Sequence, residues 1–167
     1  MEKEDLPLFA EWFSTPEVTG EYNPLHQMSK AGAEKMLENP HERKPFIIQK
    51  KDGSKIGFVT HFCVLHPAGK LLEIGYSLVP NERGKGYCTE AVEIMLDYLF
   101  LSRDTMRIQA CTDTRNHASQ KVLEKAGFKK EGTMRKYLFI RGQLRDSIVY
   151  SILREEWKQP KILTKIA

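Results

Sequence analysis

The stretch Glu73-Ile-Gly-Tyr-Ser-Leu-Val-Pro80, followed directly by Asn81-Glu-Arg-Gly-Lys-Gly-Tyr-Cys88, decides the fold. Its first part reads as a strand, and the glycines Gly84 and Gly86 lead from it into a long helical pattern. At such a junction the first N–H groups of the helix lack intrahelical partners and carry partial positive charge. The junction is therefore a candidate binding site for a diphosphate, which the glycines would let approach the backbone.

The glycine turn alone is weak evidence, because a lone Gly-x-Gly can equally be a tight turn that binds nothing. A Walker-type phosphate loop is excluded, because Gly86 stands where that loop needs Ser or Thr and the upstream glycine is missing. A dinucleotide fingerprint is also excluded, because nothing completes G-x-G-x-x-G and the preceding strands look antiparallel. The function must therefore be read from other parts of the chain as well.

Hydrophobic spacing outward from this stretch predicts an alternation typical of a mixed α/β fold. Helices are expected over residues 3–13, 29–39, 86–101 and 116–126, and strands over residues 46–49, 55–65, 71–79 and 106–111, from 128 onward, and over 134–140 and 144–153. The first three strands should form an antiparallel meander, and the last two a hairpin around Arg141-Gly142-Gln143. Gly127 should end its helix in the left-handed conformation. Two helices thus precede any strand.

Length and composition narrow the classes of protein. A chain of 167 residues suits one domain, expected over 1–157, with a basic tail over 158–167. No apolar run reaches the roughly 20 residues that span a bilayer, and the N-terminus lacks the basic and apolar segments of a secretory signal. Three widely spaced cysteines, Cys63, Cys88 and Cys111, favour reduced thiols over a disulfide framework. We expect no membrane partner and a cytoplasmic location.

Two other classes of function are weighed against these observations. A net charge of +4 and the basic region 129–145 raise the alternative of a nucleic-acid-associated protein, but no binding motif or regular aromatic interleaving accompanies them. No direct nucleic-acid partner is expected. His61, Cys63 and His66 lie close in sequence, but His66 falls at the next turn and no fourth ligand is evident. No metal is expected.

Several ordered motifs resemble the GNAT acetyltransferases, and among them the RimJ/RimL-like N-acetyltransferases. They are Glu73-Ile-Gly-Tyr-Ser-Leu, Gly84-Lys-Gly-Tyr with Thr89-Glu-Ala91, Asn116-His-Ala-Ser119, Leu123-Glu-Lys-Ala-Gly-Phe128, Glu131-Gly132, and Gly142 with Asp146 and Tyr150 before Glu156-Trp157. The resemblance covers most of the chain. It implies an α/β (α+β) fold with a twisted, mostly antiparallel sheet, helices on both faces and a V-shaped gap between two strands. Relatives usually begin with a strand, for which Met1 leaves no room.

The resemblance also implies acetyl-CoA as cosubstrate and assigns residues to it. The pyrophosphate loop would be the run Arg83, Gly84, Lys85, Gly86, Tyr87, Cys88 and Thr89, and the pantetheine strand would contain Leu78 and Val79. Asn81 departs from the Gln or Arg that opens the family's loop pattern, although main-chain amides supply most of the binding. Asn116 would contact the cofactor, or it is the N-cap of the following helix, and both roles are compatible.

The chemistry requires a base for the amine and an acid for the departing thiolate. Many GNAT enzymes use a tyrosine acid at the position that Leu123 holds here. Ser119 matches the serine proposed as thiolate partner in RimL-like enzymes, and the alternative for it is a solvated helix residue. Glu73 is the candidate base, directly or through water, on one side of its strand with Gly75 and Ser77. Its alternative is an exposed strand carboxylate.

The identity of the acceptor is the part of the reaction that the sequence determines least. The resemblance implies a primary amine, and we narrowly favour a protein N-terminal α-amine over an amino acid, a polyamine or an antibiotic. Tyr22 and His26 precede the second helix in a region that borders the acceptor site in relatives, so they are candidate substrate-binding residues or ordinary loop residues. Because Leu123 replaces the family's tyrosine acid, a noncatalytic acyl-CoA-binding module is an alternative to an enzyme. A homodimer is a further possibility.

Overall fold

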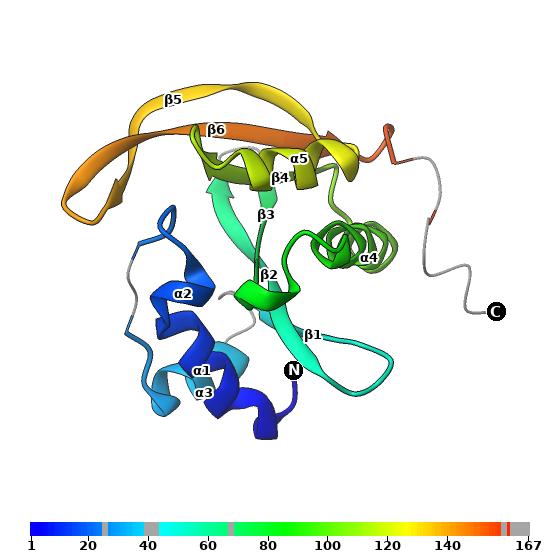
Figure 1. Ribbon diagram of the computed structural model, residues 1–167. Coiled ribbons are helices and arrows are strands. Elements are labelled where there is room, and N and C mark those ends of the chain that lie inside the picture. The colour runs from blue at the N-terminus through cyan, green and yellow to red at the C-terminus, as the bar shows by residue number, and fades with distance from the viewer. Residues whose placement is uncertain (25–26, 39–43, 67–68, 158–159, 161–167) are drawn as a thin grey trace.

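The computed structural model describes residues 1–24, 27–38, 44–66, 69–157 and 160 (Figure 1). The chain begins with short helical elements, η1 (Lys3–Asp5), α1 (Leu6–Ser14), α2 (Pro16–Thr19) and α3 (Lys30–Glu38). The strands β1 (Lys44–Gln49), β2 (Lys55–His66) and β3 (Gly69–Leu78) follow, and then η2 (Pro80–Glu82) and α4 (Tyr87–Ser102). The last elements are β4 (Arg107–Asp113), α5 (His117–Lys125), β5 (Lys129–Ile140) and β6 (Gln143–Leu153).

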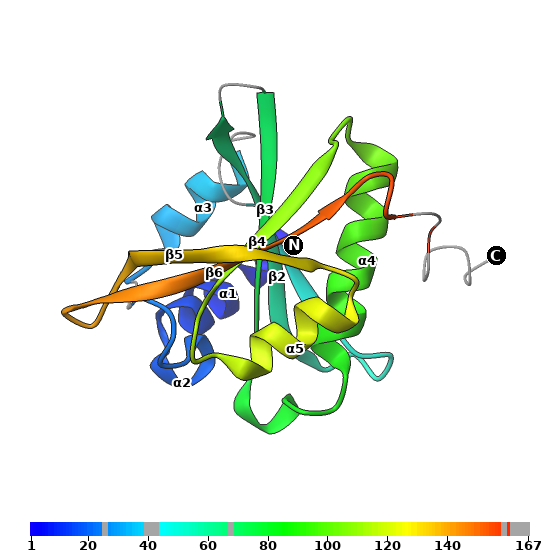
Figure 2. The ribbon, with the colours of Figure 1, turned by 90° about the horizontal axis from the view of Figure 1, so that it is seen from above.

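In the described part of the chain the strands form one six-stranded sheet in the order β1-β2-β3-β4-β6-β5. Every neighbouring pair is antiparallel except β3 and β4, which are parallel. Figures 1 and 2 show α1, α2 and α3 gathered on one side of the sheet and α4 and α5 on the other. The predicted fold class, a mostly antiparallel sheet with helices on both faces, is confirmed.

Two apolar clusters hold these layers together. The larger one packs α4, through Val92 and Leu99, against strand residues such as Ile108, and all three side chains are fully buried. The smaller one packs α1 against β2, where the rings of Phe9 and Phe58 meet edge to face with centroids 5.1 Å apart. The burial of apolar surface on both faces fixes the sheet between the helices.

The parallel pairing of β3 with β4 is short. It joins Leu72 to Ile108 and Glu73 to Gln109, and the two strands diverge beyond these pairs. On its other edge β3 remains paired with β2 as far as Leu78. The result is a V-shaped gap within the sheet, with Glu73 and Gln109 at its apex.

Three local features differ from or confirm the expectations from sequence. The helix α2 was not predicted, because four residues are too few to show a helical period. The expected strands from residue 128 and over 134–140 are one strand, β5, interrupted by a bulge after Met134. Gly127 ends α5 with a φ of 97°, as predicted.

No helix in the described ranges combines the length and the apolar character needed to cross a bilayer. Of the basic tail predicted over 158–167, only residue 160 falls among the described positions.

A buried histidine predicts how stability depends on pH. The side chain of His61, on β2, is 5% exposed, and neither ring nitrogen has a hydrogen-bond partner among the described residues. It lies against the rings of Phe46 and Tyr98. Burial, and then the positive charges of Arg103 and Lys44, lower the pKa of His61 to about 4. The folded protein therefore holds this imidazole neutral, while the unfolded chain protonates it near pH 6.5.

Because the unfolded state binds the extra proton, the free energy of unfolding should fall as the pH falls from 6.5 to 4, by about 3 kcal/mol in total. Urea unfolding of the wild type and of His61→Phe at pH 7.5, 6 and 5 measures this. The variant should lose less stability than the wild type over this range. Parallel pH profiles for the two proteins would refute the assignment.

Candidate active site

A cavity of about 920 Å³ occupies the gap between β3 and β4. One wall is β3 from Glu73 to Leu78, and the opposite wall is the end of β4 from Ala110 to Asp113. The helix α2 and the loop after it border one side, and the start of α5 and the β5–β6 hairpin border the other. The cavity is large enough for an extended ligand that reaches from the surface to Glu73.

The glycine turn lies at one end of this cavity. Gly84 lines the cavity, and Gly84 and Gly86 have φ values of 77° and 91°, in the left-handed region. A Cβ atom added at either position would meet no heavy atom within 4 Å, so both positions face open space. Gly86 is the N-cap of α4, and no side chain from the described part of the chain caps the helix. The turn therefore presents main-chain donors and room for an anion, as a diphosphate site requires.

Arg83 has a structural role that the sequence did not reveal. Its Nε donates to the backbone oxygen of Leu78 at 3.0 Å, and its Nη2 donates to the backbone oxygens of Glu17 and Val18 at 2.6 and 2.9 Å. These bonds tie the glycine turn to α2 across the mouth of the cavity. They occupy donors that would otherwise be available to a phosphate, so Arg83 positions the turn.

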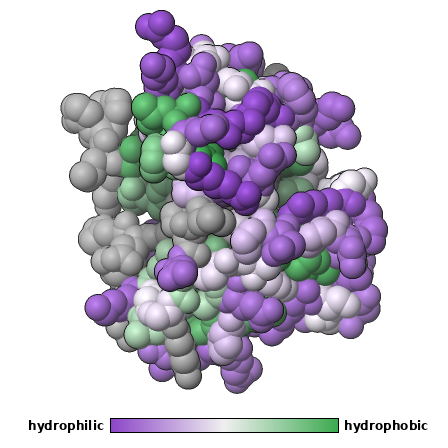
Figure 3. Space-filling model, turned by 60° about the vertical axis from the view of Figure 1, so that its left-hand side comes forward, coloured by the Kyte–Doolittle hydropathy of each residue, from purple (hydrophilic) through white to green (hydrophobic). Residues whose placement is uncertain are grey.

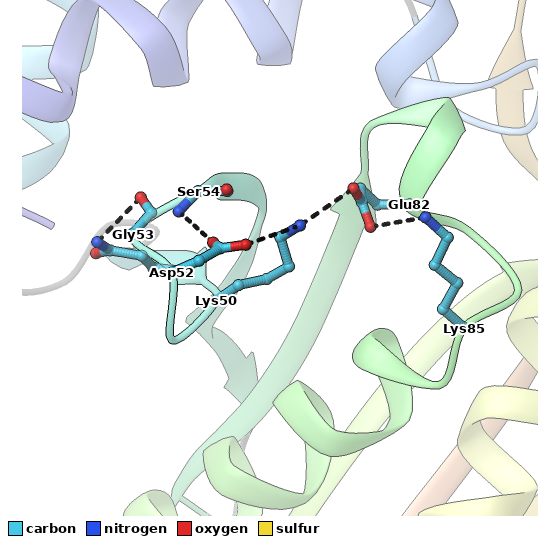
Figure 4. Close-up of polar contacts among 7 residues, drawn as sticks. Lys50, Asp52, Gly53, Ser54, Glu82 and Lys85 are labelled. Carbon is cyan, nitrogen blue, oxygen red and sulfur yellow. Dashed lines mark hydrogen bonds and ion pairs between the residues drawn. The ribbon is translucent and has the colours of Figure 1, made fainter.

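A chain of ion pairs supports the turn from the outside (Figure 4). Glu82 accepts from Lys85 at 3.1 Å and from Lys50 at 3.4 Å, and Lys50 also pairs with Asp52 at 3.5 Å. Lys50 and Asp52 belong to the β1–β2 turn, where Ser54 N donates to Asp52 at 2.9 Å. The neighbouring turn thus braces the segment before α4, and Lys85 is engaged in this contact.

Glu73 stands at the apex of the V. Its Oε2 accepts a hydrogen bond from Gln109 Nε2 at 2.8 Å and a longer one from Cys111 Sγ at 3.7 Å. Both donors are neutral, and no ion pair to Glu73 is found among the described lysines, arginines and histidines. A half-buried carboxylate without a cationic partner attracts an ammonium group and accepts a proton from it.

Two thiols line the same cavity. Burial raises the pKa of Cys88 to about 12. Burial, and then the charge and hydrogen bond of Glu73, raise the pKa of Cys111 to about 12. Both thiols therefore stay protonated near neutral pH, and a protonated thiol is a poor nucleophile. Cys111 acts as a donor to Glu73, and neither thiol is suited to form a covalent intermediate.

A pair of hydroxyl groups lines the same cavity, one from Tyr76 on β3 and one from Ser119 on α5. The hydroxyl of Tyr76 lies 2.9 Å from Ser119 Oγ and donates to the Ser119 backbone oxygen at 3.2 Å. Burial raises the pKa of Tyr76, so its hydroxyl remains protonated. Asn116 Oδ1 accepts from Ser119 N at 3.1 Å, which makes Asn116 the N-cap of α5. The cap and Tyr76 together fix Ser119 at the wall of the cavity.

The predicted acceptor residues are only partly described. Tyr22 lines the cavity, and the guanidinium of Arg115 lies 5.4 Å from the centre of its ring. Arg115 donates two side-chain hydrogen bonds to Asp113, each 3.0 Å long. Although burial opposes it, this pairing holds the pKa of Asp113 below its usual range. His26 lies outside the described residues.

The structure brings together some of the predicted site residues and not others. Those that line the cavity are Tyr22, Glu73, Leu78, Arg83, Gly84, Cys88, Asn116 and Ser119. Those on the same segment but outside the lining are Val79, Lys85, Gly86, Tyr87 and Thr89. Val79 packs instead against the smaller apolar cluster. Their roles in binding remain predictions.

Sequence reasoning missed four cavity or cavity-contacting residues, Tyr76, Gln109, Cys111 and Tyr137. Tyr76 could have been predicted from the sequence, because it belongs to the quoted Ile-Gly-Tyr motif. Gln109 and Cys111 depend on the pairing of β3 with β4, which no local pattern shows. No group of three or more potential metal ligands occurs in the parts of the chain that the structure describes. The side chain of His66 is not among them.

Comparisons with known proteins agree with this geometry. The sequence profile described as "Acetyltransferase (GNAT) domain" matches residues 1–129. An uncharacterized N-acetyltransferase, p20, of Bacillus licheniformis is 34% identical over 165 residues, which cover 94% of this chain and 92% of that protein. The crystal structure of a ribosomal-protein-S5-alanine acetyltransferase from Vibrio fischeri superposes with a TM-score of 0.78 at 26% identity, covering 95% of this chain and 92% of that one. Mycobacterium smegmatis RimJ in complex with CoA-disulfide gives 0.80 at 26% identity, with 96% and 82% covered.

Proposed function

This chain belongs to the GNAT acetyltransferase family, and on that premise we propose that it transfers the acetyl group of acetyl-CoA to a primary amine, with a protein N-terminal α-amine as the favoured acceptor. The observation that carries the proposal is the V between β3 and β4, with Glu73 at its apex and Gly84 at its mouth. It supplies an anion site and a proton acceptor at opposite ends of one cavity. The similarity to the Vibrio fischeri structure, which is named as a ribosomal-protein-S5-alanine acetyltransferase, supports the choice of a protein acceptor.

The cavity fits acetyl-CoA as a substrate. The open space at Gly84 and the main-chain amides at the start of α4 suit the pyrophosphate. The divergent edge of β3 from Ile74 to Leu78 suits the pantetheine arm, whose amides can bond to free main-chain groups. The thioester would then lie toward Glu73. Asn116 borders the same path.

The proposed reaction is a direct transfer. The acceptor enters as an ammonium ion beside Glu73, loses a proton to its carboxylate and attacks the thioester carbon. The new C–N bond forms as the C–S bond breaks, and the departing thiolate takes a proton from the hydroxyl of Ser119, which Tyr76 supports. The second proton of the attacking nitrogen restores the Ser119 hydroxyl, and the proton on Glu73 passes to water. The pair Ser119–Tyr76 would thus do the work that a tyrosine at the position of Leu123 does in many GNAT enzymes.

Two alternatives share the same cavity. The acceptor could be a small amine, such as an amino acid, a polyamine or an antibiotic, because the fold is common to all these activities. A noncatalytic acyl-CoA-binding module would keep the glycine turn. It would have no use for a proton acceptor such as the Glu73 carboxylate at the apex, which forms no ion pair with the described residues. Glu73 therefore favours an enzyme.

Mass spectrometry of products tests the proposal and the acceptor class together. The protein is incubated with acetyl-CoA and a mixture of peptides beginning with alanine or serine, polyamines, amino acids and aminoglycosides. We expect a product heavier by one acetyl group and stoichiometric release of CoA. Acetylated peptides would support the α-amine acceptor. CoA binding without any acetylated product would establish the noncatalytic alternative.

Replacing Ser119 should separate chemistry from binding. In Ser119→Ala the hydroxyl of Tyr76 remains close to the same place, so we expect turnover to fall by about tenfold, less than for loss of an isolated general acid. Affinity for acetyl-CoA should stay the same. Steady-state kinetics measures the first and calorimetry the second, with Ser119→Thr as a control that keeps the hydroxyl. Unchanged turnover in Ser119→Ala would remove the acid role.

A further inference from the structure

The β5–β6 hairpin carries an irregular segment beside the cavity. Its two strands pair up to Met134 and resume pairing at Leu138, which leaves residues 135–137 as a bulge. Within it Lys136 has a φ of 51°, in the left-handed region that lysine seldom adopts. Such a conformation persists only where its surroundings hold it, and it is concentrated at functional sites.

Asp146, on β6, holds the bulge in place. Its Oδ1 accepts the backbone N–H of Lys136 at 2.8 Å, and its backbone oxygen accepts the N–H of Thr114 at 3.3 Å. Thr114 directly follows β4, so Asp146 joins the bulge to the wall of the cavity. The proposed reaction gives Asp146 no role, although it belongs to the motifs by which the chain resembles its family.

The residue that the bulge presents is Tyr137. Its side chain is 55% exposed and lines the cavity together with Glu73 and Cys111. Burial, and then the neighbouring Cys111 and Glu73, raise the pKa of Tyr137. Figure 3 shows the side from which the hairpin projects, where hydrophobic surface lies among hydrophilic regions.

Resting on the proposed function, we propose that Tyr137 is an acceptor-positioning residue, whose ring contacts the primary ammonium group of the acceptor and its adjoining carbon atoms beside Glu73. An ammonium group is attracted both to the face of an aromatic ring and to a carboxylate. The bulge turns the ring toward the cavity, as bulges beside active sites commonly do. Asp146 acts through the bulge and never touches the acceptor.

Binding and kinetics of matched variants test this inference. The probes are a peptide with an N-terminal alanine and spermidine, each titrated by calorimetry into the CoA-saturated protein and each also used as acceptor with acetyl-CoA. Tyr137→Ala should weaken binding of the preferred probe and raise its KM about tenfold, whereas Tyr137→Phe, which keeps the ring, should stay close to the wild type. The KM for acetyl-CoA should not change.

Two further variants distinguish positioning from general damage. Phe139→Ala removes an aromatic side chain that is 65% exposed on the same strand but outside the cavity lining, and it should leave both KM values unchanged. Asp146→Ala, which removes the acceptor of the Lys136 N–H, should reproduce the acceptor defect of Tyr137→Ala with Tyr137 intact. The double variant Asp146→Ala/Tyr137→Ala should be no worse than Tyr137→Ala, because both changes act through one ring.

Equal affinity of the wild type and Tyr137→Ala for both probes, including no binding by either, would overturn the inference. A loss of acetyl-CoA affinity in Tyr137→Ala that matches the loss of acceptor affinity would also overturn it. Binding that depends on Tyr137 but leads to no acetylated product would support the acceptor contact and contradict the proposed transfer. The two failures are therefore distinguishable.

Discussion

Glu73→Gln should lower kcat by about 100-fold or more while leaving the affinity for acetyl-CoA unchanged, because a general base contributes roughly 100- to 10,000-fold. The substitution keeps the size of the side chain, and the new amide oxygen can still accept from Gln109 Nε2, which lies 2.8 Å from the carboxylate. The substitution removes the capacity to take the amine proton and also the negative charge that attracts the ammonium group, so the KM for the acceptor should rise as well. Steady-state kinetics with the acceptor found by mass spectrometry measures kcat, and calorimetry measures binding.

Glu17→Gln is the matched control for this prediction. Glu17 lies on α2 at the edge of the same cavity, so its substitution removes the same charge without touching the apex. Screening by salt limits the effect of such a distant exposed charge to about twofold. A kcat for Glu73→Gln within this range would show that the amine loses its proton elsewhere, and water would then be the leading acceptor.

Gly84→Val should weaken binding of CoA by about 100-fold, equivalent to roughly 3 kcal/mol. The φ of 77° at Gly84 is strained for a β-branched residue, and strain of this kind costs on the order of 1–3 kcal/mol. Relief of that strain would turn the amides of the segment away from the phosphates. The added methyl groups would also enter the open space at the mouth of the cavity. Calorimetric titration with CoA measures the loss.

Gly142→Val controls for the strain itself. Gly142 has a φ of 78° and open space around it, but it lies in the turn between β5 and β6, outside the cavity lining. This variant should lose stability to heat and keep its affinity for CoA. If Gly84→Val and Gly142→Val bind CoA equally well, the glycine turn is not the pyrophosphate site.

Much of the fold could be predicted from local patterns. The period of apolar residues located α1, α3, α4 and α5 and the antiparallel meander, because each pattern extends over several turns or alternations. The left-handed glycine after α5 was predictable from chemistry alone. The bulge in β5 was not, because its cause is a contact between Lys136 and Asp146 from a neighbouring strand.

The site was predictable only in outline. Glu73 was predicted from its side of the strand and Ser119 from a family resemblance, while their hydrogen-bond partners come from distant parts of the chain. Gln109 reaches Glu73 across a parallel strand pair, and Tyr76 reaches Ser119 across the gap to α5. Arg83 illustrates the opposite case. A basic residue beside a phosphate-binding turn suggests a contact with the ligand, but in the structure Arg83 donates hydrogen bonds to backbone carbonyls. Pairings of this kind depend on tertiary structure.

The early end of the β3–β4 ladder has a thermodynamic consequence. Beyond Glu73 and Gln109 the main-chain groups of the two strands no longer bond to each other, so the middle of the sheet lacks backbone hydrogen bonds there. An amide-bearing arm inserted between the strands would form hydrogen bonds to both and join the two halves of the sheet. Ligand occupancy should therefore raise the melting temperature and slow amide hydrogen exchange on both sides of the seam, so that the substrate acts as a temporary central strand.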